Sequence, residues 1–397
     1  MVLSRNICLF LQLDMGNFDF IREKILNWYE VHKRILPWRD ITDPYKIWIS
    51  EVILQQTRVI QGLEYYKRFI ERFPDVHALA IAEEQEVLKY WQGLGYYSRA
   101  RNLHVAAQSI ETRFGGKFPE DYKSILSLKG IGEYTAAAIA SFAFNLPYPV
   151  VDGNVFRFLS RFFAIEEPVD TSKGKKLFTE LAAQMMDRRQ AGLFNQAIME
   201  FGALQCVPAS PDCGECLLAT HCLSKMQGRV SEFPVKLNKP KTKELYLYYF
   251  YIHSGEFIFL KKREGKGIWQ NLYEFPSVES EVSLEFEDLI KHKDFRRLFP
   301  ANTCHPTLDA GFPEKSTTDC QGIAGLRFAP PAMTFKLLVK NYKHVLTHRI
   351  LYADFYEISV ENELGLEKYK KIKQNEIGEY PMHRLMQFFF EKFKLYL

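Results

Sequence analysis

The chain has 397 residues, of which 47% are hydrophobic and 25% charged, a composition that excludes disordered and collagen-like proteins. This length is enough for about two or three packed domains. The 52 basic and 48 acidic residues leave a formal net charge of +4, so bulk charge predicts neither a nucleic acid nor a membrane as a partner. Any partner must be inferred from local sites.

The N-terminus carries a short apolar run after Arg5, and Met15 is a second possible start. The run, residues 7–13, has no small-residue cleavage site after it, so we do not expect a secretory signal. The longest mostly apolar stretch, 134–151, contains Asn145, Pro147 and Pro149. It therefore predicts a core helix and its exit, not a membrane span.

The pattern of apolar residues along the chain changes near residue 240. From about Phe18 to Ala219, apolar residues recur at three- and four-residue spacing, which predicts an all-helical half. Residues 229–243 are polar, basic and proline-containing, as interdomain linkers are. Aromatic and β-branched runs at 245–253, 256–261 and 349–360 then predict strands, and 381–396 a closing helix. We expect a helical domain over 16–228, a linker over 229–243 and an α+β domain over 244–397, with a long loop at 302–324.

A glycine turn separates two predicted helices, around 121–126 and from about Tyr134. Gly130 and Gly132 let the backbone approach another surface closely, and free N–H groups at the next helix start can hold a phosphate. Gly-x-Gly turns also join helices for steric reasons alone, so the pattern leaves both interpretations open. In the phosphate-binding interpretation the turn is a helix-hairpin-helix motif, and Lys129 adds a further phosphate contact.

Four of the seven cysteines follow one another with the spacing Cys-x6-Cys-x2-Cys-x5-Cys. Such clustered thiolates can enclose one compact metal centre, and seven cysteines are too few for a disulfide scaffold, so we expect a reducing compartment. An iron-sulfur cluster, a structural zinc and unliganded thiols are the alternatives; four-cysteine zinc sites usually contain two Cys-x2-Cys pairs, and this chain has one. The predicted ligands are Cys206, Cys213, Cys216 and Cys222. Cys8, Cys304 and Cys320 are isolated, and we expect ordinary thiols there.

Several motifs together resemble, in order, the MutY family of adenine DNA glycosylases. They are Leu36–Arg39, Glu51–Thr57, Trp91–Arg101, the glycine turn, Val151–Asn154, Phe194–Ala197 and the four cysteines. The resemblance covers about residues 20–225. It implies a helix-hairpin-helix glycosylase domain with one four-iron, four-sulfur (4Fe-4S) cluster, which removes adenine mispaired with 8-oxoguanine or guanine from double-stranded DNA in base-excision repair. It also implies a monomer in the bacterial cytosol or nucleoid, without a membrane partner, and leaves protein partners open.

One position separates this family from relatives with lyase activity, such as endonuclease III. Those relatives carry a lysine two residues after the second hairpin glycine, where an amine can form a Schiff base with the sugar. Here that position is Tyr134. A phenol cannot form a Schiff base, so we predict a monofunctional glycosylase. The alternatives are an endonuclease III-like glycosylase/lyase for oxidised pyrimidines and a non-catalytic iron-sulfur protein that binds DNA. Glu51 together with Asp152 argues against the second alternative.

Cleaving the bond between adenine and its sugar needs an acid for the leaving base and negative charge near the cationic sugar, as in glycosidases. Glu51 lies among apolar residues, which disfavour a charged carboxylate and suit a general acid, although the residues alone favour a partly exposed helix glutamate. The resemblance implies that Glu51 protonates adenine and then handles the incoming water. It also implies that Asp152 stabilises the cationic sugar or adds to it transiently. Asp152 also suits a helix N-cap. We expect Asn154 and Tyr134 to orient this site.

Adenine must leave the duplex, and the protein has to fill the gap and hold the extruded base. The resemblance implies a base pocket near Gln56 and Gln196, lined also by Leu54 and Thr57. It implies that Gln55 and Tyr96 enter the helix beside the mispair, with Tyr96 as an aromatic wedge; without the resemblance, Tyr96 and Tyr97 suit a core aromatic pair equally well. The predicted phosphate contacts are Arg99, Arg101, Lys129, Gly130 and Gly132.

Two segments of the second half, Gly267–Pro276 and Lys343–His348, resemble the C-terminal domain of the same family, a Nudix-like fold that reads 8-oxoguanine. The sequence lacks the glutamate-rich box of Nudix hydrolases, so we expect recognition without hydrolysis. Thr347 and His348 stand where the family has a Ser-His pair that contacts the lesion; a strand-end histidine with a local hydrogen bond is the alternative for His348. Leu346 departs from the phenylalanine that relatives often carry, and 302–324 looks like an insertion.

Overall fold

The computed structural model describes residues 18–237, 242–299, 306–308, 333–360 and 366–395. The N-terminal apolar run, Met15, Cys8, Cys304 and Cys320 lie outside these ranges, as does most of the 302–324 loop. Within that loop, Pro306–Leu308 form a short strand, β5. Among the described residues, no helix combines the length and hydropathy that crossing a bilayer requires.

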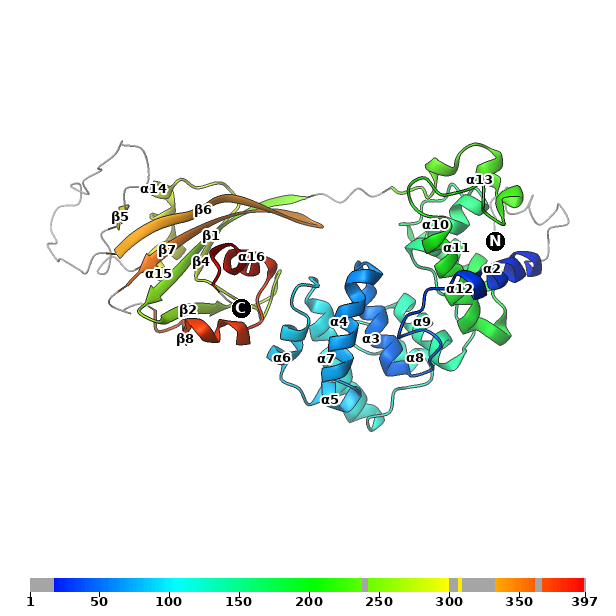
Figure 1. Cartoon of the computed structure of the whole chain (residues 1–397), viewed down its shortest axis with the longest axis horizontal. Helices are drawn as coiled ribbons and strands as arrows, with labels where there is room; N and C mark the ends of the chain where they lie inside the picture. The colour runs from blue at the N-terminus through cyan, green and yellow to red at the C-terminus, as the bar shows by residue number, and fades with distance from the viewer. Residues whose placement is uncertain (1–17, 238–241, 300–305, 309–332, 361–365, 396–397) are drawn as a thin grey trace. The chain divides into compact units, whose positions relative to one another are not determined.

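The chain divides into two compact units. The described residues of the first lie within Met1–Ala82 and Arg99–Lys239, and those of the second within Glu83–Ser98 and Pro240–Leu397. The elements of each unit are labelled in Figure 1. The sheet-containing unit therefore includes a helical segment, 83–98, that the sequence pattern placed in the helical half.

The first unit is helical in all its described elements, as predicted. Its α-helices are α2 (Asp19–His32), α3 (Pro44–Leu54), α4 (Val59–Arg72), α5 (Val76–Ala80), α7 (Ser98–Phe114), α8 (Tyr122–Leu126), α9 (Glu133–Phe144), α10 (Gly153–Phe162), α11 (Ser172–Met185), α12 (Ala191–Leu204) and α13 (Leu223–Met226). Short 3-10 turns lie at η1 (Arg188–Gln190), η2 (Ala219–His221) and η3 (Val230–Glu232).

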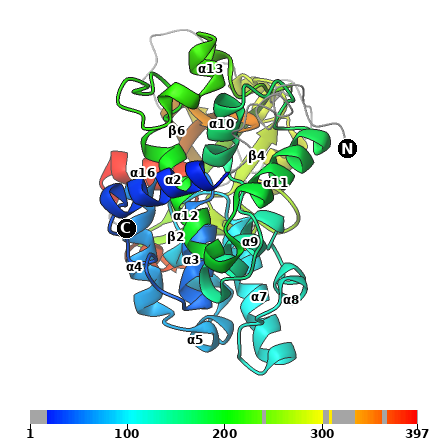
Figure 2. The same cartoon turned by 90° about the vertical axis from the view of Figure 1, so that its right-hand side faces the viewer.

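Three of these helices form the middle of the unit, with α9 packed against both α3 and α12 (Figure 2). Helix α3 begins at Pro44, after the N-cap Asp43, and buries nearly every residue from Tyr45 to Ile53. Helix α9 is buried from Thr135 to Ser141. Since a helix that is apolar on all sides must be enclosed, this patterning places both helices in the interior. Any polar side chain that they carry is held inside the protein.

The second unit is built on a mixed eight-stranded sheet. Its strands are β1 (Lys243–Ser254), β2 (Phe257–Lys262), β3 (Tyr273–Glu274), β4 (Ser277–Ser280), β5, β6 (Met333–Leu346), β7 (Arg349–Ser359) and β8 (Lys370–Lys373), and its helices are α6 (Glu84–Tyr90), α14 (Phe286–Leu289), α15 (Lys293–Leu298), η4 (Gln374–Glu379) and α16 (Arg384–Phe393). The strand order is β3-β2-β1-β7-β6-β5, with β4 paired to β1 and β8 to β2. The predicted multidomain fold, an all-α half followed by an α+β half, is confirmed.

Strands β1 and β7 run parallel, and β6 and β7 run antiparallel with Leu346 opposite Arg349. That register leaves only Thr347 and His348 for the turn, so both side chains are exposed. The strand pairing thus presents the predicted lesion-reading residues at the tip of a hairpin. The predicted closing helix is present but shorter, since α16 ends at Phe393.

Candidate active site

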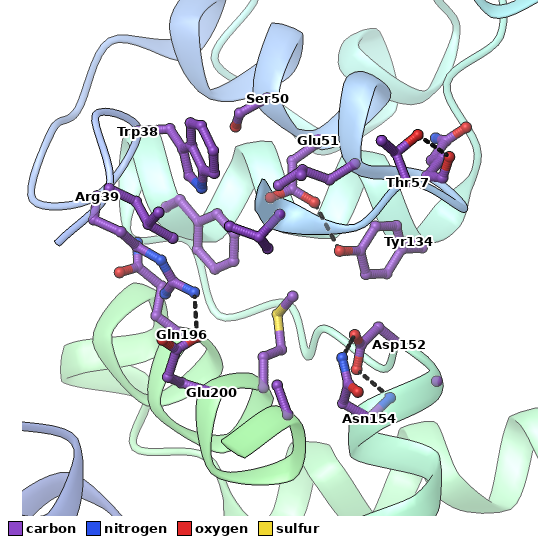
Figure 3. Close-up of a pocket in the computed structure, with 18 of the residues that line it drawn as sticks. Trp38, Arg39, Ser50, Glu51, Thr57, Tyr134, Asp152, Asn154, Gln196 and Glu200 are labelled. Atoms are coloured by element: carbon purple, nitrogen blue, oxygen red, sulfur yellow. Dashed lines mark hydrogen bonds and ion pairs between the residues drawn. The ribbon is translucent and has the colours of Figure 1, made fainter. Parts of the chain in front are cut away.

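A cavity of about 550 Å³ lies in the first unit and is lined by residues of α3, α9, α10 and α12 (Figure 3). Most of the predicted catalytic and base-pocket residues of this unit line it: Glu51, Leu54, Gln55, Gln56, Thr57, Tyr134, Asp152, Asn154 and Gln196. These residues come from segments far apart in the sequence. The packing of the four helices brings them together.

Glu51 lies on the buried helix α3 with 7% of its surface exposed. The Glu51 side chain accepts a hydrogen bond from the hydroxyl of Tyr134, on α9, which donates to Oε2 at 2.7 Å. Burial raises the pKa of Glu51 to about 7, and the Tyr134 hydrogen bond opposes that rise. The alternative of a partly exposed helix glutamate is therefore wrong. At neutral pH this carboxyl can give up a proton and take one back.

Asp152 is the N-cap of α10. Its Oδ1 accepts from the backbone N–H groups of Asn154 and Val155 at 2.9 and 2.8 Å, and its Oδ2 accepts from Asn154 Nδ2 at 2.6 Å. Burial raises the pKa of Asp152, while these N–H donors lower it because they stabilise the charged form. The two carboxyls that share the cavity thus have different surroundings, apolar for Glu51 and rich in donors for Asp152.

A second polar cluster in the same cavity escaped the sequence interpretation. Glu200, with 1% of its side chain exposed, accepts from Nε and Nη2 of Arg34 at 2.7 and 2.6 Å, and from Nη2 of Arg39 at 3.1 Å. Glu200 stands one helical turn after Gln196 on α12, and Arg39 belongs to the Leu36–Arg39 motif, so the sequence does contain a sign of this cluster. Burial would raise the pKa of Glu200, but the arginine contacts outweigh it and lower the pKa.

The structure gives Arg99 a role other than the predicted phosphate contact. Its guanidinium is buried, and Nη1 donates to the carbonyl oxygens of Val52, Ile53 and Gln55 at 2.7, 3.1 and 2.6 Å. These are carbonyls at the end of α3, which have no partner within the helix. Arg99 therefore supports the helix that carries Glu51, and the prediction of a phosphate contact is corrected. Arg101 remains partly exposed.

The glycine turn shows the steric requirement that the sequence suggested, and its phosphate contact stays a prediction. Gly130 has φ +79°, and a Cβ there would lie 2.5 Å from Cβ of Asn102, so this glycine is required for steric reasons. Gly132 is the N-cap of α9 and faces open space. Lys129 is exposed. Gly132 and Glu133, at the start of α9, are likewise exposed.

The four cysteines line one common cavity next to α10 and α12. Arg161 Nη1 lies 3.5 Å from the sulfur of Cys206, and Arg157 Nε donates to the Cys206 carbonyl at 2.6 Å. Among the described residues, no group of three or more candidate ligands has converged to metal-binding geometry. Four thiols around one cavity supply the donor set of either an iron-sulfur cluster or a structural zinc.

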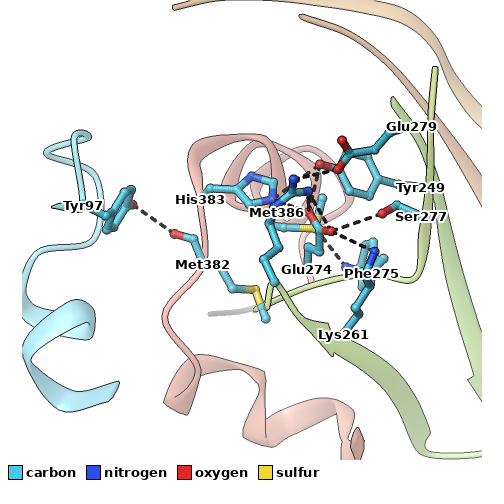
Figure 4. A network of polar contacts seen from close by, with 11 residues as sticks. Tyr97, Tyr249, Lys261, Glu274, Phe275, Ser277, Glu279, Met382, His383 and Met386 are labelled. Atoms are coloured by element: carbon cyan, nitrogen blue, oxygen red, sulfur yellow. Dashed lines mark hydrogen bonds and ion pairs between the residues drawn. The ribbon is translucent and has the colours of Figure 1, made fainter. Parts of the chain in front are cut away.

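The second unit holds the predicted wedge beside the predicted lesion reader. Tyr96 is 43% exposed with φ +48°, and its hydroxyl is hydrogen bonded to the hydroxyl of Thr347. The alternative of a buried aromatic pair applies only to Tyr97, which is 5% exposed. Tyr97 donates from its hydroxyl to the carbonyl oxygen of Met382 at 3.2 Å (Figure 4). Met382 N–H in turn donates to Gln92 Oε1 at 3.0 Å.

Next to Met382, the second unit contains a buried ionic network (Figure 4). Glu274, fully buried, accepts from Arg263 Nη1 at 2.9 Å and from His383 Nε2 at 3.1 Å. Burial would raise the pKa of Glu274, but His383 and Arg263 hold it down at about 2. The His383 ring stacks on Trp269 with centroids 3.8 Å apart. The network therefore ties the start of α16 to the sheet and to the turn that carries Trp269.

Comparison with known proteins gives two family matches. The model of the HhH-GPD superfamily of base excision DNA repair proteins matches residues 49–184, and that of the NUDIX domain matches residues 248–392. The chain is 39% identical to an adenine DNA glycosylase of Buchnera aphidicola subsp. Baizongia pistaciae, over 64% of this chain and 72% of that protein.

A plant protein and a solved structure are also similar to the chain. The chain is 38% identical to an adenine DNA glycosylase of Arabidopsis thaliana, over 65% of this chain and 47% of that protein. Among solved structures, a thermostable thymine-DNA glycosylase is similar with a TM-score of 0.50 and 28% identity, over 53% of this chain and 97% of that one. The similarity to that structure concerns about half of the chain.

The N-cap at Asp152 gives a prediction about stability. Asp152→Ala removes the acceptor for two backbone N–H groups, so we expect the free energy of unfolding to fall by about 0.5–2 kcal/mol. Asp152→Asn keeps a side-chain oxygen and should stay close to the wild-type value. Chemical denaturation followed by circular dichroism, with hydrogen exchange at the amides of Asn154 and Val155, measures both. Equal losses in the two variants would contradict the N-cap explanation.

Proposed function

Because the chain belongs to the family of adenine DNA glycosylases, enzymes of base-excision repair, we propose that it removes adenine mispaired with 8-oxoguanine or guanine from double-stranded DNA. The reaction proposed is hydrolysis of the N-glycosidic bond after the adenine has been flipped out of the duplex. The observation that supports this proposal most directly is the cavity in which Glu51, with its raised pKa, and the N-capping Asp152 both lie.

In the proposed reaction Glu51 acts as an acid and Asp152 stabilises a cation. Protonated Glu51 gives its proton to a ring nitrogen of adenine, and the electrons of the breaking bond between C1′ and the base nitrogen leave with the base. The sugar becomes an oxocarbenium-like cation, which the Asp152 carboxylate stabilises. A water molecule then adds to C1′ and passes a proton to the Glu51 carboxylate, which restores the acid. Tyr134 and Asn154 hold Glu51 and Asp152 in position through their hydrogen bonds.

We propose a monofunctional enzyme, without a lyase step. A Schiff base with the sugar needs an amine. Within the part of the chain that the structure describes, Tyr134 and arginines line the cavity and no lysine does. Arginine keeps its proton at any pH that the protein meets, so Arg34 and Arg39 do not act as nucleophiles. This argument disfavours the alternative of an endonuclease III-like glycosylase/lyase.

The proposed DNA contacts come from both units. The start of α9, with Lys129, Gly130 and Gly132, suits a backbone phosphate, because outward N–H groups and the helix dipole favour an anion. Arg101 is a further candidate, whereas the buried Arg99 is not. We propose that Gln55 and Tyr96 enter the duplex beside the mispair. At the tip of the β6–β7 hairpin, Thr347 and His348 would read the base opposite adenine.

We propose that Cys206, Cys213, Cys216 and Cys222 hold one 4Fe-4S cluster. A set of four thiols on one loop fits such a group by its donor chemistry. When bound, the cluster would cross-link the loop after α12 and hold it against α10. We further propose domain boundaries at 16–228, 229–243 and 244–397, and a monomer in the cytosol or nucleoid of a bacterium.

The function is tested on duplexes with adenine opposite 8-oxoguanine, guanine or thymine. We expect excision opposite the first two, with strand breaks only after alkali and with no covalent adduct on borohydride reduction. Glu51→Gln should lose about 10²–10⁴-fold in single-turnover rate, the usual contribution of a general acid, while duplex binding persists. Absence of abasic sites on every duplex would refute the proposal. Efficient borohydride trapping would refute the monofunctional mechanism alone.

The raised pKa of Glu51 predicts the pH dependence. The acid form is needed for the first step, so the excision rate should fall as the pH rises through about 7. Tyr134→Phe removes the hydrogen bond that lowers this pKa, so the falling limb should move to higher pH. Tyr122→Phe is a matched control, because Tyr122 stacks on Tyr148 and does not line the cavity. A limb that stays in place in Tyr134→Phe would contradict the assignment to Glu51.

The metal centre is tested by absorption and elemental content. We expect a brown protein with broad visible absorption, and iron and acid-labile sulfide in equal amounts. Cys213→Ser should lose colour and iron, whereas Cys320→Ser, at an isolated cysteine, should keep both. A colourless wild-type protein with stoichiometric zinc would establish the zinc alternative.

A further inference from the structure

We propose that Tyr29 is a positioning residue for the extruded base, because it orients the side-chain amide of Gln196 with its NH2 group toward the cavity. Tyr29 is on α2, is 1% exposed and does not line the cavity. Gln196 does line it. The inference rests on the proposed function, since it concerns the base that the cavity would hold.

The contact between the two side chains is direct. The hydroxyl of Tyr29 lies 2.9 Å from Oε1 of Gln196, and the two residues are 167 positions apart in the sequence. On its other side, the same hydroxyl oxygen lies 3.2 Å from Nη1 of Arg39. The hydroxyl is therefore held between a side chain that only donates and one that can present either a donor or an acceptor.

The direction of these hydrogen bonds follows from the chemistry of arginine. A guanidinium has five N–H donors and no acceptor, so the Tyr29 oxygen must accept from Arg39. The hydroxyl hydrogen is then available to Gln196, which must meet it with its carbonyl oxygen. The reversed amide would turn its NH2 group to Tyr29 and leave a buried hydroxyl hydrogen without an acceptor, which is unfavourable.

Arg39 is itself fixed, so this direction is maintained. Its Nη2 donates to Oε2 of Glu200 at 3.1 Å, and Glu200 is further held by Arg34 through bonds of 2.7 and 2.6 Å. Figure 3 shows Arg39, Gln196 and Glu200 together at one side of the cavity. The charged pair Arg39–Glu200 thus anchors a chain of hydrogen bonds that ends at the Gln196 amide.

The consequence concerns which edge of the base Gln196 can meet. With Oε1 engaged by Tyr29, the NH2 group is the donor left for a ligand. Adenine carries acceptors at its ring nitrogens and one exocyclic amine as donor, so a fixed NH2 group pairs with a ring nitrogen. An amide free to rotate would spend part of its time with its carbonyl oxygen toward that nitrogen, where two lone pairs repel.

The test uses Tyr29→Phe, which removes the hydroxyl and keeps the ring. In steady-state turnover on an adenine:8-oxoguanine duplex, we expect kcat/KM to fall about 10-fold, the equivalent of one hydrogen bond near 1.4 kcal/mol. In a Gln196→Leu background, Tyr29→Phe should change kcat/KM no further, because Tyr29 acts through Gln196. Equal falls in both backgrounds, or no fall in the first, would overturn the inference while leaving the proposed function intact.

Tyr45→Phe is the matched control for folding. Tyr45 is also buried and donates from its hydroxyl, to the Phe73 carbonyl at 2.7 Å, but it does not line the cavity. The Tyr45→Phe substitution should lower Tm without changing kcat/KM. A readout independent of activity is the ¹⁵N side-chain amide resonance of Gln196, assigned by its loss in Gln196→Leu. Tyr29→Phe should shift that resonance, and an unchanged resonance would refute the inference even if the enzyme removed no adenine.

Discussion

The site depends on keeping one carboxyl, that of Glu51, inside the protein without a cation of its own. Helix α3 is buried on nearly all sides, and Glu51, which lines the cavity, is only 7% exposed. Burial disfavours the charged form, and the single hydroxyl of Tyr134 compensates only in part. Arg99 supports the end of the same helix by taking three of its carbonyl oxygens. The raised pKa of Glu51 thus depends on the burial of α3 and on the contacts that support its C-terminal end.

Asp152 lines the same cavity but is held there in a different way, as the N-cap of a helix. Its N-capping bonds fix the carboxylate to the first turn of α10, and the close approach of α12 fixes α10 in turn. Gly202 permits that approach, since a Cβ there would lie 2.7 Å from the carbonyl oxygen of Asn154. A larger residue at 202 would push the first turn of α10 away. The helix cap and the carboxylate that we propose to stabilise the sugar are therefore a single structural feature.

The sequence predicted local features better than long-range ones. Helical periodicity, the glycine turn and the strand runs are local patterns, and the structure has the corresponding elements. Arg99 followed a glycine-rich loop and resembled a phosphate contact, because nothing nearby in the sequence shows that its partners are carbonyls 44 to 47 positions away. Segment 83–98 is helical in pattern, yet it packs with the sheet through contacts such as Gln92 with Met382. Such pairings arise only when the chain is folded.

Three buried glutamates show what distinguishes the proposed acid, Glu51, from carboxyls that serve the structure. Glu51, Glu200 and Glu274 are 7%, 1% and 0% exposed, so burial alone does not separate them. Arginine partners lower the pKa of Glu200, and His383 with Arg263 lowers that of Glu274. Among the described residues, no arginine is in hydrogen-bonding contact with Glu51. Arg39 lowers the pKa of Glu51 at a distance, but its Nη2 is bound to Glu200. An arginine in direct contact with Glu51 would lower its pKa further and favour the ionised form, which cannot act as an acid at neutral pH.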